Sequence, residues 1–205
     1  RAGTAWSGGD AWADDELVTI LTKWVYEGGA FIGVNEPSAV AGYDYNFRMA
    51  HVLGIDEDTG AKVCHGKWQF EAADKEGIIP AGATVEAREN RFLTDGEAEV
   101  LMASGNDPLV SIKKFGAGHG IYLASFQKGL ENNRMLYQLI RYAGGEGITG
   151  LYVTDNLYTE CAYYPASGKL VVINNSDVEQ TTTIATEKGD ITVTLAAYDT
   201  TFVEL

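Results

Sequence analysis

Positive charge is scarce in this chain. Lys and Arg total 15 against 29 Asp and Glu among 205 residues, which gives a formal net charge of −14. Nucleic acids and anionic membrane surfaces are bound through clustered Lys and Arg that neutralise phosphates. The one adjacent cationic pair is Lys113-Lys114. The composition therefore argues against a nucleic-acid partner and against a membrane partner.

Long apolar runs and cysteines are also few. No apolar run reaches the roughly 18 residues of a membrane span, and no charged-then-apolar leader precedes the first expected helix. The two cysteines, Cys64 and Cys161, are too few for a disulfide framework and fit free thiols in a cytoplasmic protein, with one bridge left open. The chain starts at Arg1 without a Met, so we expect a piece of a longer polypeptide.

The first segment has the period of a helix followed by a buried strand. Apolar residues recur at helical spacing from about residue 10 to residue 27, and Gly28-Gly29 ends the pattern. The apolar run at 30–34 (AFIGV) predicts a central strand covered on both faces. A second helix is expected at about 46–53. The residues predicted for the buried face of the first helix are Leu17, Ile20, Leu21, Trp24 and Val25.

Strand-like stretches fill the middle of the chain, and a helix is predicted at 131–145. We interpret Gly116, Gly118 and Gly120 as hairpin glycines, with His119 in the turn, because the phosphate-loop spacings are missing. The predicted strands are 62–70, 83–93, 99–104, 109–116 and 119–126.

No helical pattern survives beyond about residue 148. The fold class predicted is therefore α/β over residues 1–147, followed by a small antiparallel all-β domain over residues 148–205 that packs on its neighbour. Five strand candidates make up this second domain, at 157–165, 169–176, 179–187, 190–198 and 200–205.

The stretch "GGAFIGVNEPSAVAGYDY" (28–45) has the form of a buried strand that leads into a sharp turn. Many α/β proteins keep a nucleophile at such an elbow. Here the turn offers Asn35, Glu36 and Pro37, and its one hydroxyl, Ser38, follows the proline. The elbow is present without a cysteine, so we assign no catalytic residue to it.

Two alternatives stay open from the residues alone. A cryptic hydrolase or amidotransferase would need Cys64 as nucleophile with His51 or His119 as base, because adjacent His65 points to the opposite side of a strand. A free-standing binding or oligomerisation module needs no catalytic group. The three His and two Cys show no metal-ligand spacing, so no metal is expected.

Several segments together resemble a known enzyme family. They are "AWSGGDAWADDELVTILTKWVYEGGAFIGVNEPSAVAG", "FRMAHVLGID", "VCHGKW" and "GIYLASFQ", and they resemble the 1,3-β-galactosyl-N-acetylhexosamine phosphorylases, also called lacto-N-biose or galacto-N-biose phosphorylases. The resemblance implies a layered domain like class I glutamine amidotransferases and the trimerisation domain of β-galactosidases, without the amidotransferase nucleophile. The elbow would then be inherited scaffolding.

The family resemblance also implies where the chemistry lies. Members cleave a β-1,3-galactosyl bond with inorganic phosphate as co-substrate and no other cofactor, giving α-galactose 1-phosphate and the N-acetylhexosamine. The acid and the phosphate site belong to an N-terminal (β/α)8 barrel, which no segment here matches and which is the expected partner, together with the sugar substrate. Further copies of the same polypeptide, in a homo-oligomer, are also expected partners. The acceptor, N-acetylglucosamine, N-acetylgalactosamine or rhamnose, is left open.

Five residues are candidates for contact with the sugar. The strand at 30–34 would carry Asn35, Glu36 and Ser38 to the carboxyl edge of the sheet, where ligands of α/β proteins gather. Tyr43 and Tyr45 could stack against a sugar ring. The competing interpretation is that Glu36 caps the next helix or pairs with a cation such as Arg48.

Overall fold

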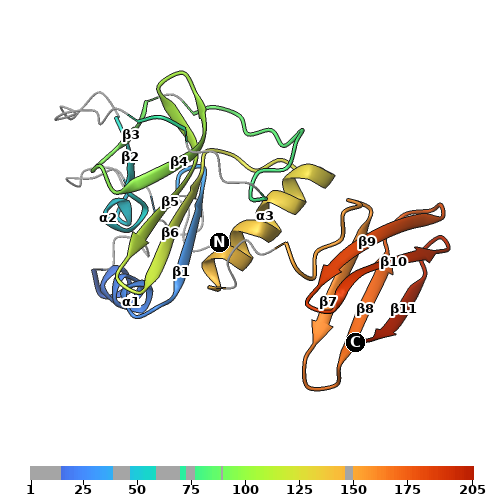
Figure 1. Cartoon of the computed structure of the whole chain (residues 1–205). Coiled ribbons are helices and arrows are strands. Elements are labelled where there is room, and N and C mark those ends of the chain that lie inside the picture. Colours follow the sequence, from blue (N-terminus) through green and yellow to red (C-terminus); the bar gives the residue numbers. More distant parts are fainter. Residues whose placement is uncertain (1–14, 39–46, 59–69, 73–76, 89, 146–149) are drawn as a thin grey trace.

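The computed structural model describes residues 15–38, 47–58, 70–72, 77–88, 90–145 and 150–205. Cys64, Tyr43, Tyr45 and most of the predicted strand at 62–70 lie outside these ranges. The described residues form a mixed α/β unit, in which strands outnumber helices, and a second unit built of strands (Figure 1). Within these ranges no helix is long and apolar enough to cross a membrane.

A four-stranded mixed sheet is the centre of the first unit (Figure 1). The first two strands of the sheet are parallel to each other, and the remaining neighbours are antiparallel. The order across the sheet is β1 (Ala30–Val34), β6 (Gly118–Leu123), β5 (Asp107–Phe115) and β4 (Ala98–Ser104).

The position of β1 corrects the prediction of a central strand. In the described part of the chain β1 pairs with β6 alone and lies at the edge of the sheet. Phe31 and Ile32 pack toward opposite faces, yet both stay only half-buried, and Val34 is 40% exposed. An apolar run predicts that a strand packs on both faces of a sheet. It does not predict how many strands pair with it.

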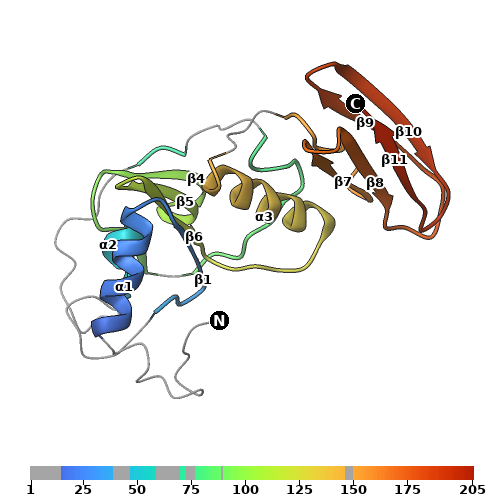
Figure 2. The ribbon, with the colours of Figure 1, turned by 90° about the horizontal axis from the view of Figure 1, so that it is seen from below.

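Helices cover the two faces of the sheet. One face packs against α1 (Asp15–Tyr26), α2 (Ala50–Leu53) and the paired strands β2 (Ile55–Glu57) and β3 (Arg91–Leu93). The other face packs against α3 (Leu130–Ala143), and Figure 2 shows α1 and α3 apart, with the sheet between them. Alternating residues of β6 serve the two cores, with Tyr122 in one and Ile121 and Leu123 in the other.

Glycines of β6 allow the helices to approach the sheet. A Cβ on Gly118 would lie 2.0 Å from the carbonyl oxygen of Gly29, and one on Gly120 would lie 2.1 Å from that of Val52. These glycines therefore serve close packing in the strand. Only Gly116, with φ of 62°, sits in the turn as predicted, and His119 is a strand residue opposite Lys114.

Four local predictions from the sequence are corrected. Ile20 and Trp24 of α1 are 55% and 50% exposed, while Val18 packs on the core in their place. Among the described residues of 83–93 only β3 is a strand, and over the described residues 47–53 the expected helix is reduced to the four residues of α2.

The second unit confirms the five predicted strands and their antiparallel pairing. A three-stranded sheet in the order β11-β8-β7 faces a two-stranded sheet of β9 and β10, and Leu170, Val172, Ile184 and Leu195 form the buried core. The strands are β7 (Thr159–Tyr164), β8 (Lys169–Asn174), β9 (Gln180–Thr186), β10 (Gly189–Leu195) and β11 (Thr200–Glu204).

Candidate functional site

The chain turns sharply where β1 ends. Asn35 and Ser38 adopt left-handed φ angles of 64° and 59°, a region that few residues other than glycine occupy. Asn tolerates this region best, which suits its place directly after the strand. The Asn35 N–H donates to the carbonyl oxygen of Leu123 at 2.9 Å and so continues the pairing of β1 with β6.

A buried arginine from another part of the chain supports this turn. Arg91 of β3 is 2% exposed. Its Nη1 lies 2.7 Å from Glu57 Oε1, its Nε donates to the Tyr122 hydroxyl at 2.8 Å, and its Nη2 donates to the Asn35 carbonyl oxygen at 3.4 Å. The guanidinium also lies over the Phe47 ring, 5.1 Å from its centroid.

These contacts keep Arg91 charged in the interior. Burial by itself lowers the pKa of Arg91. The contacts with Tyr122 and Glu57 raise it by a larger amount, so the pKa lies above the ordinary arginine value. Burial raises the pKa of Tyr122, an effect that the neighbouring guanidinium opposes. The ion pair with Glu57 already balances the charge of Arg91, which stabilises the turn and leaves little capacity to clamp a phosphate.

The structure brings three of the five predicted site residues to one edge of the sheet. Asn35 is half-buried, and its Oδ1 is enclosed without a hydrogen-bond partner among the described residues. The Glu36 side chain is exposed. Ser38 is 4% exposed, and its Oγ accepts the Met49 N–H at 3.0 Å, which fixes the start of α2.

The elbow therefore has an exposed part and an internal part. The hydroxyl of Ser38 serves the fold, and Arg48, the partner considered for Glu36, forms an ion pair with Asp15 of α1. Tyr43 and Tyr45 lie outside the described residues. Contact of any of these residues with a sugar stays a prediction.

Sequence reasoning did not single out Arg91. Its one local signal is a cation directly before the apolar pair of "RFL" in a short strand. A buried arginine needs partners to offset its desolvation, and here Glu57, Tyr122 and Asn35 come from three other segments of the chain. No spacing along the sequence predicts that these distant segments meet at Arg91.

The two histidines weighed as bases have structural contacts. His51 Nε2 shares a 2.9 Å hydrogen bond with Thr22 Oγ1, and burial followed by the charge of Lys113 lowers the His51 pKa. His119 packs edge-on against Tyr142, with ring centroids 5.3 Å apart. In the described ranges no group of three or more His, Cys, Asp and Glu side chains gathers to hold a metal.

Solved structures with a similar fold include domains of β-galactosidases. The chain is similar to the β-galactosidases of Rahnella sp. R3 and of Bacillus circulans sp. alkalophilus, each with a TM-score of 0.52 over 92% of this chain and 30% of the other. The sequence identities are 14% and 19%, so the similarity concerns the fold alone.

The sequence then defines the family. Residues 1–147 match the lacto-N-biose phosphorylase central domain, and residues 152–203 match the lacto-N-biose phosphorylase C-terminal domain. The chain belongs to the lacto-N-biose phosphorylase family, as the resemblance predicted.

Two curated relatives come from Lachnoclostridium phytofermentans. A D-galactosyl-β-1→4-L-rhamnose phosphorylase is 45% identical over 99% of this chain, and a 1,3-β-galactosyl-N-acetylhexosamine phosphorylase is 32% identical over 87% of it. The chain spans 28% and 25% of the lengths of these two proteins.

Proposed function

We propose that this chain is the non-catalytic scaffold part of a sugar phosphorylase. The parent enzyme would reversibly cleave β-1,3-galactosyl-N-acetylhexosamine with inorganic phosphate, giving α-galactose 1-phosphate and the free N-acetylhexosamine. The observation that carries this proposal is the elbow: it offers no thiol, and its one buried cation, Arg91, is occupied by Glu57 and Tyr122. The amidotransferase-like layering would be kept as architecture.

The charge of the chain supports a catalytic site elsewhere. An inverting phosphorylase holds a multiply charged phosphate beside the sugar, which calls for a clamp of cations. A chain at −14 is a poor host for it. We therefore place the clamp and the acid in an N-terminal (β/α)8 barrel of the same cytoplasmic polypeptide, and the exposed Ile20 and Trp24 of α1 suit a face that packs against further protein.

The acceptor sugar has a second candidate. The identity of 45% to the galactosyl-rhamnose phosphorylase exceeds the 32% to the N-acetylhexosamine enzyme. This difference supports L-rhamnose, joined by a β-1,4 rather than a β-1,3 bond, as the second candidate for the acceptor of the parent enzyme. The half of the reaction that transfers galactose to phosphate is the same for both acceptors.

The test is phosphorolysis by the complete polypeptide and by the 205-residue chain. With inorganic phosphate, the complete polypeptide should release galactose 1-phosphate from lacto-N-biose or from galactosyl-β-1,4-rhamnose, and the faster substrate identifies the acceptor. The chain alone should stay at the blank rate with both disaccharides. Turnover by the chain alone would overturn the scaffold assignment, and an inactive complete polypeptide would overturn the phosphorylase.

The other two candidate functions and the predicted homo-oligomer have tests of their own. A reading frame that starts directly before Arg1 would favour a free-standing module, and light scattering would measure the predicted homo-oligomer. Any hydrolase or glutaminase activity that Cys64→Ser abolishes would favour the cysteine enzyme.

A further inference from the structure

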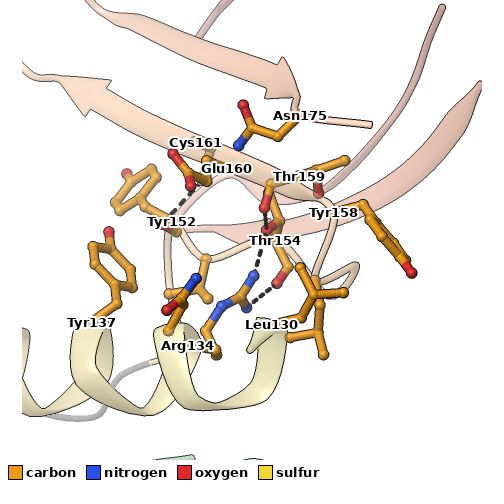
Figure 3. A pocket seen from close by; sticks show the side chains of 13 residues that line it. Leu130, Arg134, Tyr137, Tyr152, Thr154, Tyr158, Thr159, Glu160, Cys161 and Asn175 are labelled. Atoms are coloured by element: carbon orange, nitrogen blue, oxygen red, sulfur yellow. Dashed lines mark hydrogen bonds between the residues drawn. The ribbon is translucent and has the colours of Figure 1, made fainter. Parts of the chain in front are cut away.

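A pocket lies where α3 meets the beginning of the β unit, away from the elbow. Its volume is about 330 Å³, which is at the lower end of the range of about 300 to 1,000 Å³ typical of small-molecule sites. Figure 3 shows Arg134 and Tyr137 rising from α3 toward Tyr152 and Thr154. The other polar residues of the lining include Asn133, Tyr158, Glu160 and Asn175.

Hydrogen bonds fix the floor of this pocket. Arg134 donates through Nη1 to the Thr154 carbonyl oxygen at 2.5 Å and through Nη2 to the Thr154 hydroxyl at 3.0 Å. That hydroxyl in turn donates to the carbonyl oxygen of Thr159 at 2.7 Å. Because these bonds already order the floor of the pocket, ligand binding carries little additional entropic cost there.

Tyrosines supply flat apolar surface around the floor. Tyr137 and Tyr158 are 41% and 47% exposed, and Tyr152 is held rigid by stacking on Tyr163 with ring centroids 4.4 Å apart. A tyrosine presents an apolar ring and a polar tip together. Such a surface suits a ligand that is itself apolar on its faces and rich in hydroxyls at its edge.

The polar groups of the lining favour a neutral ligand. Both terminal nitrogens of Arg134 donate to Thr154, so two of its five N–H groups are already committed to the floor of the pocket. Glu160 adds a carboxylate to the same wall, which repels phosphates and accepts hydrogen bonds from hydroxyls. Asn133 and Asn175 add amides that both donate and accept.

We propose that this pocket binds a neutral monosaccharide unit, with its ring against the tyrosines and its hydroxyls toward Glu160 and the two asparagines. This proposal does not depend on the scaffold role proposed above. Sugar binding in the pocket can be measured without any turnover by the chain. The ligand class follows from the combination of flat apolar walls, paired donors and acceptors, and an occupied cation.

The test is isothermal titration calorimetry on the 205-residue chain, with D-galactose, L-rhamnose and N-acetyl-D-glucosamine as neutral probes. Inorganic phosphate and galactose 1-phosphate are the anionic probes. The variants Tyr158→Ala and Glu160→Gln alter the pocket by different chemistry. The matched control is Tyr198→Ala, which removes a tyrosine of the β unit that is 70% exposed and is not part of the lining. Circular dichroism melts check that each variant folds.

At least one neutral probe should bind saturably, with a dissociation constant on the order of 1 mM, equivalent to about −4 kcal/mol. Each pocket variant should weaken that binding at least tenfold, while the control leaves it unchanged. If one pocket variant fails to fold, the other decides. The proposal is overturned if no neutral probe saturates, if phosphate binds more tightly than the sugars, or if both pocket variants bind like the control.

Discussion

Arg134 and Thr154 join the two units of the fold. Two nitrogens of one guanidinium donate to the backbone carbonyl and to the side-chain hydroxyl of a single residue, at 2.5 and 3.0 Å. The same helix adds a second link, because Arg141 donates to the carbonyl oxygen of Leu151 at 3.0 Å. The β unit is thus attached through directional contacts to α3 as well as through the chain.

Replacing Arg134 by Lys should loosen this attachment. Lysine keeps the charge but cannot reproduce two parallel hydrogen bonds. We expect a loss of about 1 to 2 kcal/mol in the free energy of unfolding by urea, with faster amide exchange at Thr154. Arg88→Lys is the control, since the exposed Arg88 has one side-chain hydrogen bond among the described residues, a long 3.4 Å contact to the Ala124 carbonyl. Equal stability of the two variants would contradict the role given to Arg134.

Gly120→Ala should destabilise the α/β unit severely. The added Cβ would lie 2.1 Å from the carbonyl oxygen of Val52, so α2 must move away from the sheet and leave a packing defect that costs about 2 kcal/mol or more. Gly144→Ala is the matched control, because its φ is −74° and the nearest atoms would lie at 3.5 Å. Thermal melts should separate the two variants clearly; similar melting temperatures would refute the packing argument.

Arg91→Met should be costly because it leaves charged and polar partners behind. Removing one member of a fully buried ion pair costs about 3 to 5 kcal/mol, and a smaller loss is expected here because the Glu57 side chain is 22% exposed, although Glu57 and the Tyr122 hydroxyl both lose their contact with Arg91. The double variant Arg91→Met with Glu57→Gln also removes the carboxylate charge that had been paired with Arg91 and should recover part of the loss in urea denaturation. A double variant that is as unstable as the sum of the two single variants would show that the pair is not coupled.

Cys161 should react slowly with alkylating reagents in the folded chain. Burial raises its pKa from 9.0 to about 11, and its thiol donates to the Tyr152 carbonyl at 3.1 Å. At pH 8.5 the folded thiol is almost wholly protonated, so iodoacetamide should label it at least tenfold more slowly than in urea. The Cys64→Ser background isolates this thiol, and equal rates in folded and unfolded protein would disprove the shift.

The same shift gives a pH dependence with a definite sign. Between about pH 9 and 11 the unfolded chain releases the Cys161 proton while the folded chain retains it. Stability should therefore fall as the pH rises through this window. Cys161→Ala in the Cys64→Ser background should flatten this part of the profile in urea titrations.

Glu36 is tested in the complete polypeptide, assayed for the proposed phosphorolysis. If it contacts sugar hydroxyls, Glu36→Gln should lower kcat/KM by about tenfold, or about 1.4 kcal/mol of transition-state stabilisation, with the melting temperature unchanged. Glu27→Gln is the control, as another exposed glutamate, whose ion pair among the described residues is with Lys23 on the surface of α1. A loss of stability with intact kinetics would assign Glu36 to the fold.

The sequence by itself determined the two long helices, the strands of the β unit and the family. Amphipathic periods predicted α1 and α3, alternation and turn residues predicted all five strands of the β unit, and four segments together resembled the phosphorylases. These features are local, because a period or a glycine turn is set by residues a few positions apart.

Only the tertiary structure decided which face of each element is buried and which groups meet. It placed β1 at the sheet edge, exposed Ile20 and Trp24, and turned Gly118 and Gly120 from hairpin residues into contact points for helices. It also gathered Arg91, Glu57 and Tyr122 behind the elbow. Burial and long-range pairing depend on the neighbours that the fold supplies, and no spacing along the chain encodes them.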